Sequence, residues 1–325
     1  MRDRSRSRCT SSPDRGLSIG RIRSTGRFAT RRWLAITCSF GRAATQKSAA
    51  FCSESIRRAS FWRGSGGSSG VRGGGGGVQD FAEQVAVVTG SGAGIGRAYA
   101  EAFASRGAAV AVVDIEESLA LETAEYIEAQ GGRALGLRAD VASEEDAQVA
   151  IERIVRGLGA IDVLVNNAGL HLGPYNETTG LPLAAWRRLL DVNLLGALVW
   201  SKHARPHLAR RPGAILNQSS NSSTMGTGAY SVSKLALNGL TVSLAREFAA
   251  EGIRVNAIAP GYVESDAAKS GLSEDHKALV TRGQITKRVG QMGDLVDTAL
   301  LLCSDSTAFV NGQTWFVDGG WQVGL

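Results

Sequence analysis

Cysteine is scarce, and its position limits what can stabilise the fold. The 325 residues include four cysteines, of which only Cys303 lies beyond residue 80. A single cysteine cannot form a disulfide framework, so we expect the rest of the chain to fold in a reducing compartment. Histidine is also rare, with four in the chain, and no group of His, Cys, Asp and Glu has the spacing of a metal site. We therefore expect no metal.

Long hydrophobic runs are missing as well. No uninterrupted apolar run in the sequence reaches the roughly 18 residues that a membrane-spanning helix needs. A hydrophobic content of 43% is that of a globular protein. We expect neither a membrane span nor a membrane partner, and the length permits one large α/β domain or two smaller ones.

Acidic residues are scarce only near the N-terminus. Residues 1–80 hold 16 basic and 4 acidic side chains, a formal charge of +12. The remainder holds 20 basic and 26 acidic side chains, a formal charge of −6. The basic character of the whole chain therefore belongs to this first segment, and the acidic remainder gives no reason to expect nucleic-acid binding.

Residues 1–77 are predicted to be a disordered leader rich in Arg, Ser and Gly, which cannot bury a core. We favour translated upstream sequence, because no methionine occurs between Met1 and Met225 and five glycines directly precede Val78. Such glycines would result from translating a purine-rich ribosome-binding stretch ahead of a GTG start. A mitochondrial transit peptide and a nucleic-acid tail are the alternatives. We expect a cytoplasmic protein, or a matrix protein if the leader is a transit peptide.

Residues 78–325 are predicted to form one domain in which strands and helices alternate. The predicted strands are 85–89, 109–113, 134–139, 161–165, 214–218, 253–258 and 313–317. The predicted helices are 97–103, 116–130, 144–157, 186–209, 230–250 and 294–303. This order predicts an α/β fold with a single doubly wound, Rossmann-like parallel sheet and helices on both faces.

The first strand runs directly into a glycine turn and then a helix. This order predicts a phosphate cradle, because a helix N-terminus presents free N–H groups and glycines let a pyrophosphate approach closely. The common pattern G-x-G-x-x-G does not fit, since Ile95 stands in place of its third glycine. The glycines fall instead at Gly90, Gly94 and Gly96. A glycine turn alone is weak evidence.

An acidic residue ends the second strand. Asp114 follows Gly96 by 18 residues, close to the roughly 20 expected for the acid that binds the adenosine ribose. Its carboxylate can accept from a ribose 2′-hydroxyl and would repel a 2′-phosphate. The flanking residues Ser91, Ala93 and Ile115 carry no positive charge. The sequence therefore predicts NAD rather than NADP, although an exposed acid that caps the next helix would look the same.

Several motifs follow the glycine turn in a fixed order. They are Thr89–Gly96, Asp140-Val141, Asn166–Gly169, Tyr230–Lys234, Pro260-Gly261 and Val317–Gly320. Together they resemble the classical short-chain dehydrogenase/reductase family from about Gln84 to the C-terminus. No single motif is specific for the family, but the order and spacing of all of them together are specific.

The resemblance implies a catalytic set of Asn193, Ser220, Tyr230 and Lys234. Tyrosine would exchange the hydroxyl proton, the nearby ammonium would favour phenolate, and the serine would polarise the substrate oxygen. Asn193 would position a relay water through its side chain or a kinked backbone. The serine lies ten residues before the tyrosine, where the family usually has about thirteen, so Ser219 remains an alternative.

The resemblance also implies which residues bind the cofactor. Asn166 is expected to tie neighbouring strands together, and Ser265 stands where the family usually has threonine against the carboxamide. The remaining expected contacts are Gly90, Ala93, Gly94, Ile95, Gly96, Asp114, Ile115, Asp140, Val141, Asn167, Ala168, Gly169, Tyr230, Lys234, Pro260, Gly261 and Val263. Residues 262–289 would close over the substrate, and with His171, Met225 and Trp186 they would set substrate choice.

Three functions follow as hypotheses. The first is NAD-dependent interconversion of a secondary alcohol and a ketone. The second is reduction of a 3-oxoacyl thioester, which Asp114 disfavours because reductive synthesis usually uses NADPH. The third is a dinucleotide-binding regulator without turnover, which has no need of the complete catalytic set. The resemblance also implies a homotetramer or dimer built through the helices near 186–209 and 230–250.

Overall fold

The computed structural model describes residues 81–171, 175–264 and 274–323. The leader predicted for residues 1–77 lies outside the described residues, as does Ser265.

Seven parallel strands form one sheet in the order β3-β2-β1-β4-β5-β6-β7. The strands are β1 (Val85–Thr89), β2 (Ala109–Asp114), β3 (Arg133–Arg138), β4 (Val163–Asn166), β5 (Ala214–Gln218), β6 (Arg254–Pro260) and β7 (Thr314–Val317). All seven occur where the sequence predicts them, with bounds that differ by at most two residues. The predicted parallel sheet is confirmed.

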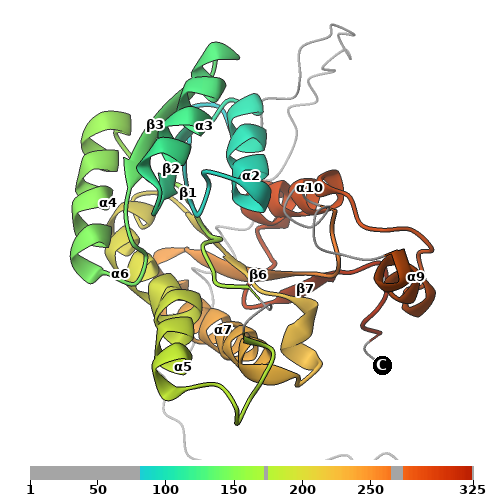
Figure 1. Ribbon diagram of the computed structural model, residues 1–325. Coiled ribbons are helices and arrows are strands. Elements are labelled where there is room, and N and C mark those ends of the chain that lie inside the picture. Colours follow the sequence, from blue (N-terminus) through green and yellow to red (C-terminus); the bar gives the residue numbers. More distant parts are fainter. Residues whose placement is uncertain (1–80, 172–174, 265–273, 324–325) are drawn as a thin grey trace, which may run out of the picture. The chain divides into compact units, whose positions relative to one another are not determined.

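Helices cover both faces of the sheet (Figure 1). One face carries α2 (Gly94–Ser105), α3 (Glu117–Ala129) and α10 (Met292–Cys303). The other carries α4 (Glu144–Leu158), α6 (Gly196–Leu208) and α7 (Gly228–Glu247), and α5 (Leu183–Leu190) lies next to α7. This arrangement is the predicted doubly wound fold.

Each strand contributes to two cores because its side chains alternate between the faces. In β1, Val85 and Val87 pack in the core beneath α4 and α6, whereas Ala86 and Val88 pack in the core beneath α2 and α3. Every residue of β1 is buried. A strand covered on both faces has few polar positions, which explains the nearly continuous apolar run in the sequence.

The long helix predicted over residues 186–209 is not continuous. It consists of α5, a π-helical turn over Asp191–Leu195, and α6. The turn places Asn193 where its side chain bonds the backbone of the loop after β4. A tertiary contact thus changes the helix locally, and apolar periodicity does not reveal such a change. A further helix, α9 (Glu274–Gly283), lies in a stretch where the sequence shows little period.

The strand order reverses between β1 and β4. The chain passes from β1 to β2 and β3 on one side, and from β4 to β5 and β6 on the other. In open parallel sheets, ligands bind in the crevice that this reversal opens at the carboxyl ends of the strands. The glycine turn follows β1 and the Asn167–Gly169 loop follows β4, so both predicted motifs meet at this crevice.

Candidate active site

A cleft of about 560 Å³ opens at this end of the sheet. It collects most of the residues that the sequence singled out, although they come from seven separate stretches of the chain. The predicted residues that line it are Gly90, Ala93, Gly94, Ile95, Gly96, Asp114, Ile115, Asp140, Val141, Asn167, Ala168, Gly169, Ser220, Tyr230, Lys234, Pro260 and Gly261. Ser219 and His171 also line it.

The glycine turn has a conformation that larger residues would prevent. Gly90 has a φ of +62°, and a Cβ there would lie 2.8 Å from Cα of Ala168. A Cβ on Gly96 would overlap the carbonyl oxygen of Gly90. Asn167 donates from Nδ2 to the carbonyls of Thr89 and Gly90, both at 3.0 Å. The loop after β4 therefore holds the turn in place.

The start of α2 is free to bind an anion. Its N-cap, Ala93, has no side chain that could accept from the N–H groups of the first turn. These groups and the helix dipole favour a phosphate at this point. The structure therefore fits the pyrophosphate of a dinucleotide.

Asp114 lies at the end of β2, beside the glycine turn. Its carboxylate accepts from the N–H of Gly92 at 2.9 Å and from the N–H of Glu116 at 3.1 Å. Each oxygen takes one of these bonds and keeps capacity for another acceptor contact. The second bond resembles the helix-capping alternative, but the first fixes the carboxylate against the cofactor turn.

Lys234 and Tyr230 lie one helical turn apart on α7, with the ammonium 5.8 Å from the centre of the phenol ring. Nζ of Lys234 donates to the carbonyl oxygen of Gln218 at 2.7 Å. Burial lowers the pKa of Lys234 to about 8. Burial raises the pKa of Tyr230, and a hydrogen bond from Ser220 opposes that shift. Ser220 therefore lies beside the phenol oxygen of Tyr230.

The two serines at the end of β5 have different partners. Ser219 donates to Oδ1 of Asn238 at 2.6 Å and is 3% exposed. Ser220 accepts from the N–H of Ser222 at 3.2 Å and lies close enough to the phenol of Tyr230 to oppose the rise in its pKa. A short 3₁₀ turn, Asn221–Thr224, fills the shortened connection to α7. The geometry thus pairs Ser220, rather than Ser219, with the tyrosine.

Asn193 lies behind the cleft and does not line it. Its Oδ1 accepts from the N–H of Leu170 at 2.7 Å, while Nδ2 donates to the carbonyl of Leu170 at 3.0 Å and to Ser233 at 3.1 Å. The side chain is 2% exposed. Because these bonds occupy the amide, the backbone of the π-helical turn is the part of Asn193 that is left for a water.

Two other expectations have different outcomes. Asn166 donates to Asn217 at 2.8 Å and to Ser201 at 3.2 Å, so it ties β4 to β5 and α6 as expected. Val263 does not line the cleft, because its backbone bridges Gly290 and it faces a neighbouring cavity. That bridge joins segments far apart in the sequence, so no local pattern could indicate it.

Two of the polar residues that line the cleft were not predicted from the sequence. Arg188 of α5 reaches Asp140 at 3.2 Å, so the one basic side chain near the expected adenine end is already ion-paired among the described residues. Gln218 ends β5 and is buried. The sequence could have indicated Gln218 as a site residue, because it is a polar residue at the end of an apolar strand. Arg188 lies on a helix whose sequence gives no such indication.

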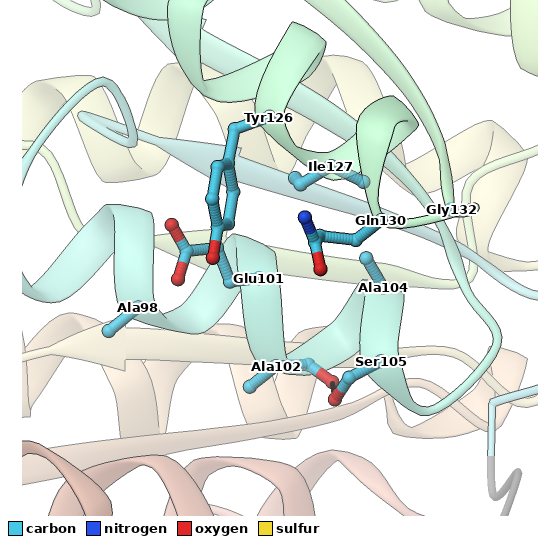
Figure 2. Close-up of a pocket in the computed structure, with 9 residues that line it drawn as sticks. All are labelled: Ala98, Glu101, Ala102, Ala104, Ser105, Tyr126, Ile127, Gln130 and Gly132. Carbon is cyan, nitrogen blue, oxygen red and sulfur yellow. Dashed lines mark hydrogen bonds between the residues drawn. The ribbon is translucent and has the colours of Figure 1, made fainter.

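A second depression lies between α2 and α3, away from the cleft (Figure 2). It is larger, at about 630 Å³, but none of the predicted site residues lines it. Its carboxylate, Glu101, is ion-paired with Arg97 at 2.8 Å. Among the described residues there is neither a group of three potential metal ligands nor a helix long and apolar enough to span a membrane. The chemistry therefore concentrates in the cleft at the strand ends.

A dinucleotide cradle next to a Ser-Tyr-Lys group, whose lysine is buried, defines the cleft as that of a nicotinamide-dependent oxidoreductase. The comparison with known proteins agrees with this class. A family model described as "Enoyl-(Acyl carrier protein) reductase" matches residues 90–322. The chain belongs to the short-chain dehydrogenase/reductase family.

Three relatives illustrate the match. Cis-4-hydroxycyclohexanecarboxylate dehydrogenase of Sinomonas cyclohexanicum is 40% identical over 75% of this chain and 98% of its own length. Cyclohexanol dehydrogenase of Acinetobacter sp. strain SE19 is 35% identical over 74% of this chain and 96% of its own. A solved 7α-hydroxysteroid dehydrogenase, in complex with NADH and 7-oxo-glycochenodeoxycholic acid, is 33% identical with a TM-score of 0.70. The match covers 74% of this chain and 94% of the chain of that structure.

Proposed function

We propose that this protein is an NAD-dependent dehydrogenase that interconverts a ring-borne secondary alcohol and its ketone. The observation that carries the proposal is the group formed by Ser220, Tyr230 and the buried Lys234, in which the lysine lies one helical turn from the tyrosine. This proton-exchanging group opens into the same cleft as the glycine turn. A substrate carbonyl bound here would meet a hydrogen-bond donor and a proton source together.

The choice of NAD rests on charge at the adenine end. Asp114 presents a carboxylate that the N–H of Gly92 holds at 2.9 Å. The only basic side chain of the described residues lining the cleft outside the catalytic group is Arg188, and Asp140 neutralises it. A 2′-phosphate would meet a negative charge without a free positive one. The relative solved with NADH supports the same choice.

In the mechanism, each residue acts on the substrate oxygen or its proton. Ser220 donates to that oxygen, and Tyr230 supplies its proton in the reducing direction or removes it in the oxidising direction. Lys234, when protonated, stabilises the phenolate and binds the nicotinamide ribose. When bound, the nicotinamide donates or accepts the hydride. The backbone at Asn193 holds the water through which the proton reaches solvent.

Relatives indicate the substrate class. The dehydrogenases from Sinomonas and Acinetobacter are named for cyclohexane alcohols, and the solved relative holds a steroid ketone. In all three names the reacting oxygen belongs to a ring carbon. We infer that this chain also acts on an alicyclic secondary alcohol.

Two other functions are possible outcomes. The description of the family model names an acyl-carrier-protein substrate, which supports the thioester reductase reading. Asp114 opposes it, since the corresponding reductive chemistry draws on NADPH. The regulator reading would require a site without proton exchange, whereas Ser220 and Tyr230 are in contact.

We also propose a homotetramer or dimer of the domain that follows the leader. Helices α6 and α7 expose Leu198, Val232, Leu235 and Val242, which a second copy would cover. A monomer mass by light scattering would contradict this assembly. The single cysteine among the described residues is buried and free, which suits the reducing, cytoplasmic compartment that we propose.

The experiment is a screen for turnover. The protein is supplied with cyclohexanol, a hydroxycyclohexanecarboxylate, a hydroxysteroid and a 3-hydroxyacyl thioester, each with NAD and with NADP. We expect absorbance of NADH to appear with at least one ring alcohol and NAD. Faster turnover with NADP would contradict the role of Asp114, turnover of the thioester alone would favour the reductase, and no turnover would favour the regulator.

A further inference from the structure

Gln218 has an environment unlike that of any other residue of β5. The strand runs Ala214, Ile215, Leu216, Asn217 and Gln218 and is buried throughout. Asn217 faces α7, where it donates to Thr241 at 2.9 Å. Gln218 points to the opposite face, towards α2, and also lines the cleft.

Tyr99 of α2 fixes the orientation of the Gln218 amide. The tyrosine is fully buried and its hydroxyl donates to Oε1 of Gln218 at 2.9 Å. Burial raises the pKa of Tyr99, so the phenol keeps its proton. If the amide were turned over, this buried O–H would have no acceptor among the described residues, which is unfavourable. The oxygen of Gln218 therefore faces Tyr99.

The amide nitrogen must then face the cleft. Nε2 of Gln218 donates to none of the described residues, and it is not one of the enclosed polar atoms without a partner. Since Gln218 is 7% exposed and lines the cleft, its accessible surface lies there. The cleft thus contains an oriented N–H₂ donor that the expected catalytic set does not include.

The backbone of the same residue connects this donor to the catalytic group. The carbonyl oxygen of Gln218 accepts from Nζ of Lys234 at 2.7 Å, and Ser220 follows two residues later. Asp114, at the expected adenine end, lies on β2, which is three strand positions from β5. At roughly 4.8 Å per strand, these ends are about 14 Å apart. Gln218 therefore belongs to the nicotinamide end.

We propose that the side-chain amide of Gln218 donates a hydrogen bond to an oxygen of the nicotinamide half of the bound dinucleotide, with Tyr99 as the residue that positions it. The inference rests on the proposed function, because it requires a nicotinamide dinucleotide in the cleft. One side chain then serves two elements: its oxygen ties β5 to α2, and its nitrogen binds the cofactor.

The test compares the binding of two ligands by wild type and variants. NADH binding is measured by fluorescence titration, and binding of AMP, which lacks the whole nicotinamide half of the dinucleotide, by calorimetry. The double variant Tyr99→Phe/Gln218→Met replaces both buried partners with apolar groups of similar shape, so we expect it to fold. Gln218→Glu keeps an oxygen for Tyr99 and loses the donor. Gln130→Glu, on the surface at the end of α3, is the matched charge control.

We expect both Gln218 variants to bind NADH about tenfold more weakly, and AMP within twofold of wild type. Gln130→Glu should bind both ligands as wild type does, and melting temperatures should show that every protein is folded. Unchanged NADH binding, or an equal loss of AMP binding, would overturn the inference. A wild-type protein that binds neither ligand would instead refute the proposed function, on which the inference depends.

Discussion

At the scale of single residues, neighbours in the sequence have different tasks because strand geometry sends their side chains to different places. Ser219 is committed to Asn238 of α7, whereas Ser220 contacts Tyr230. The sequence could not separate them, since the shortened connection to the tyrosine leaves the alignment of either serine open. The separation depends on the 3₁₀ turn that follows Ser220.

Substitution of the two serines should have opposite effects. Ser220→Ala should lower kcat/KM by about 10²–10³-fold, as removal of a donor to a reacting oxygen does. Ser219→Ala should change kcat/KM less than fivefold but should lower the free energy of unfolding by about 1 kcal/mol, because Asn238 loses its partner. Steady-state kinetics and thermal melts measure both. The reverse pattern would mean that Ser219 is the serine that contacts substrate.

Lys234 gives cofactor binding a dependence on pH. Its pKa is lowered to about 8 from an ordinary 10.5, so the ammonium form predominates below pH 8 and is lost above it. Cofactor hydroxyls that accept from the ammonium favour its protonated form, so binding takes up protons as the pH rises past 8. NADH affinity should therefore fall between pH 8 and pH 10.

A titration series across this range measures the effect. The Lys234→Met variant should bind NADH more weakly than wild type, and its affinity should stay flat over the same interval. A wild-type affinity that is constant from pH 7 to pH 10 would show that the ammonium does not contact the cofactor.

At the scale of elements, the unit β1–turn–α2 depends on Gly90 and Gly96, which are evident in the sequence. Its type could be predicted because the apolar strand, the glycines and the helix follow one another directly. The hydrogen bonds that hold the turn could not be predicted, because Asn167 reaches the turn from 77 residues away. The same limit applies to the π-helical turn around Asn193, which is made by a bond to the loop after β4.

A methyl group at Gly96 should destroy this unit. In Gly96→Ala the new Cβ would overlap the carbonyl oxygen of Gly90, so we expect a loss of NADH binding of more than a hundredfold and a lower melting temperature. Gly293→Ala is the control, because it is helical, exposed and has no heavy atom within 4 Å of the added Cβ. It should bind normally and be no less stable than wild type. Normal NADH binding by Gly96→Ala would refute the assigned cradle.

At the scale of the whole molecule, alternation of strands and helices was sufficient to predict the sheet, its parallel sense and its two helical layers. Local periodicity also placed each strand to within one or two residues. Local periodicity could not predict the backbone bridge of Val263 or the ion pair between Arg188 and Asp140, since each joins segments that are distant in the sequence. Substrate choice depends on such contacts between distant segments. The proposal that the substrate is a ring alcohol therefore rests on the relatives and not on the sequence pattern.

The most direct test of the account is the rate of NADH formation by wild type and by Tyr230→Phe, on the ring alcohol that turns over fastest. The variant keeps the aromatic ring and loses only the hydroxyl that exchanges the substrate proton. The account predicts a fall in kcat of about 10²–10⁴-fold, with NADH affinity within about threefold of wild type. Turnover by Tyr230→Phe within a few-fold of wild type would contradict it.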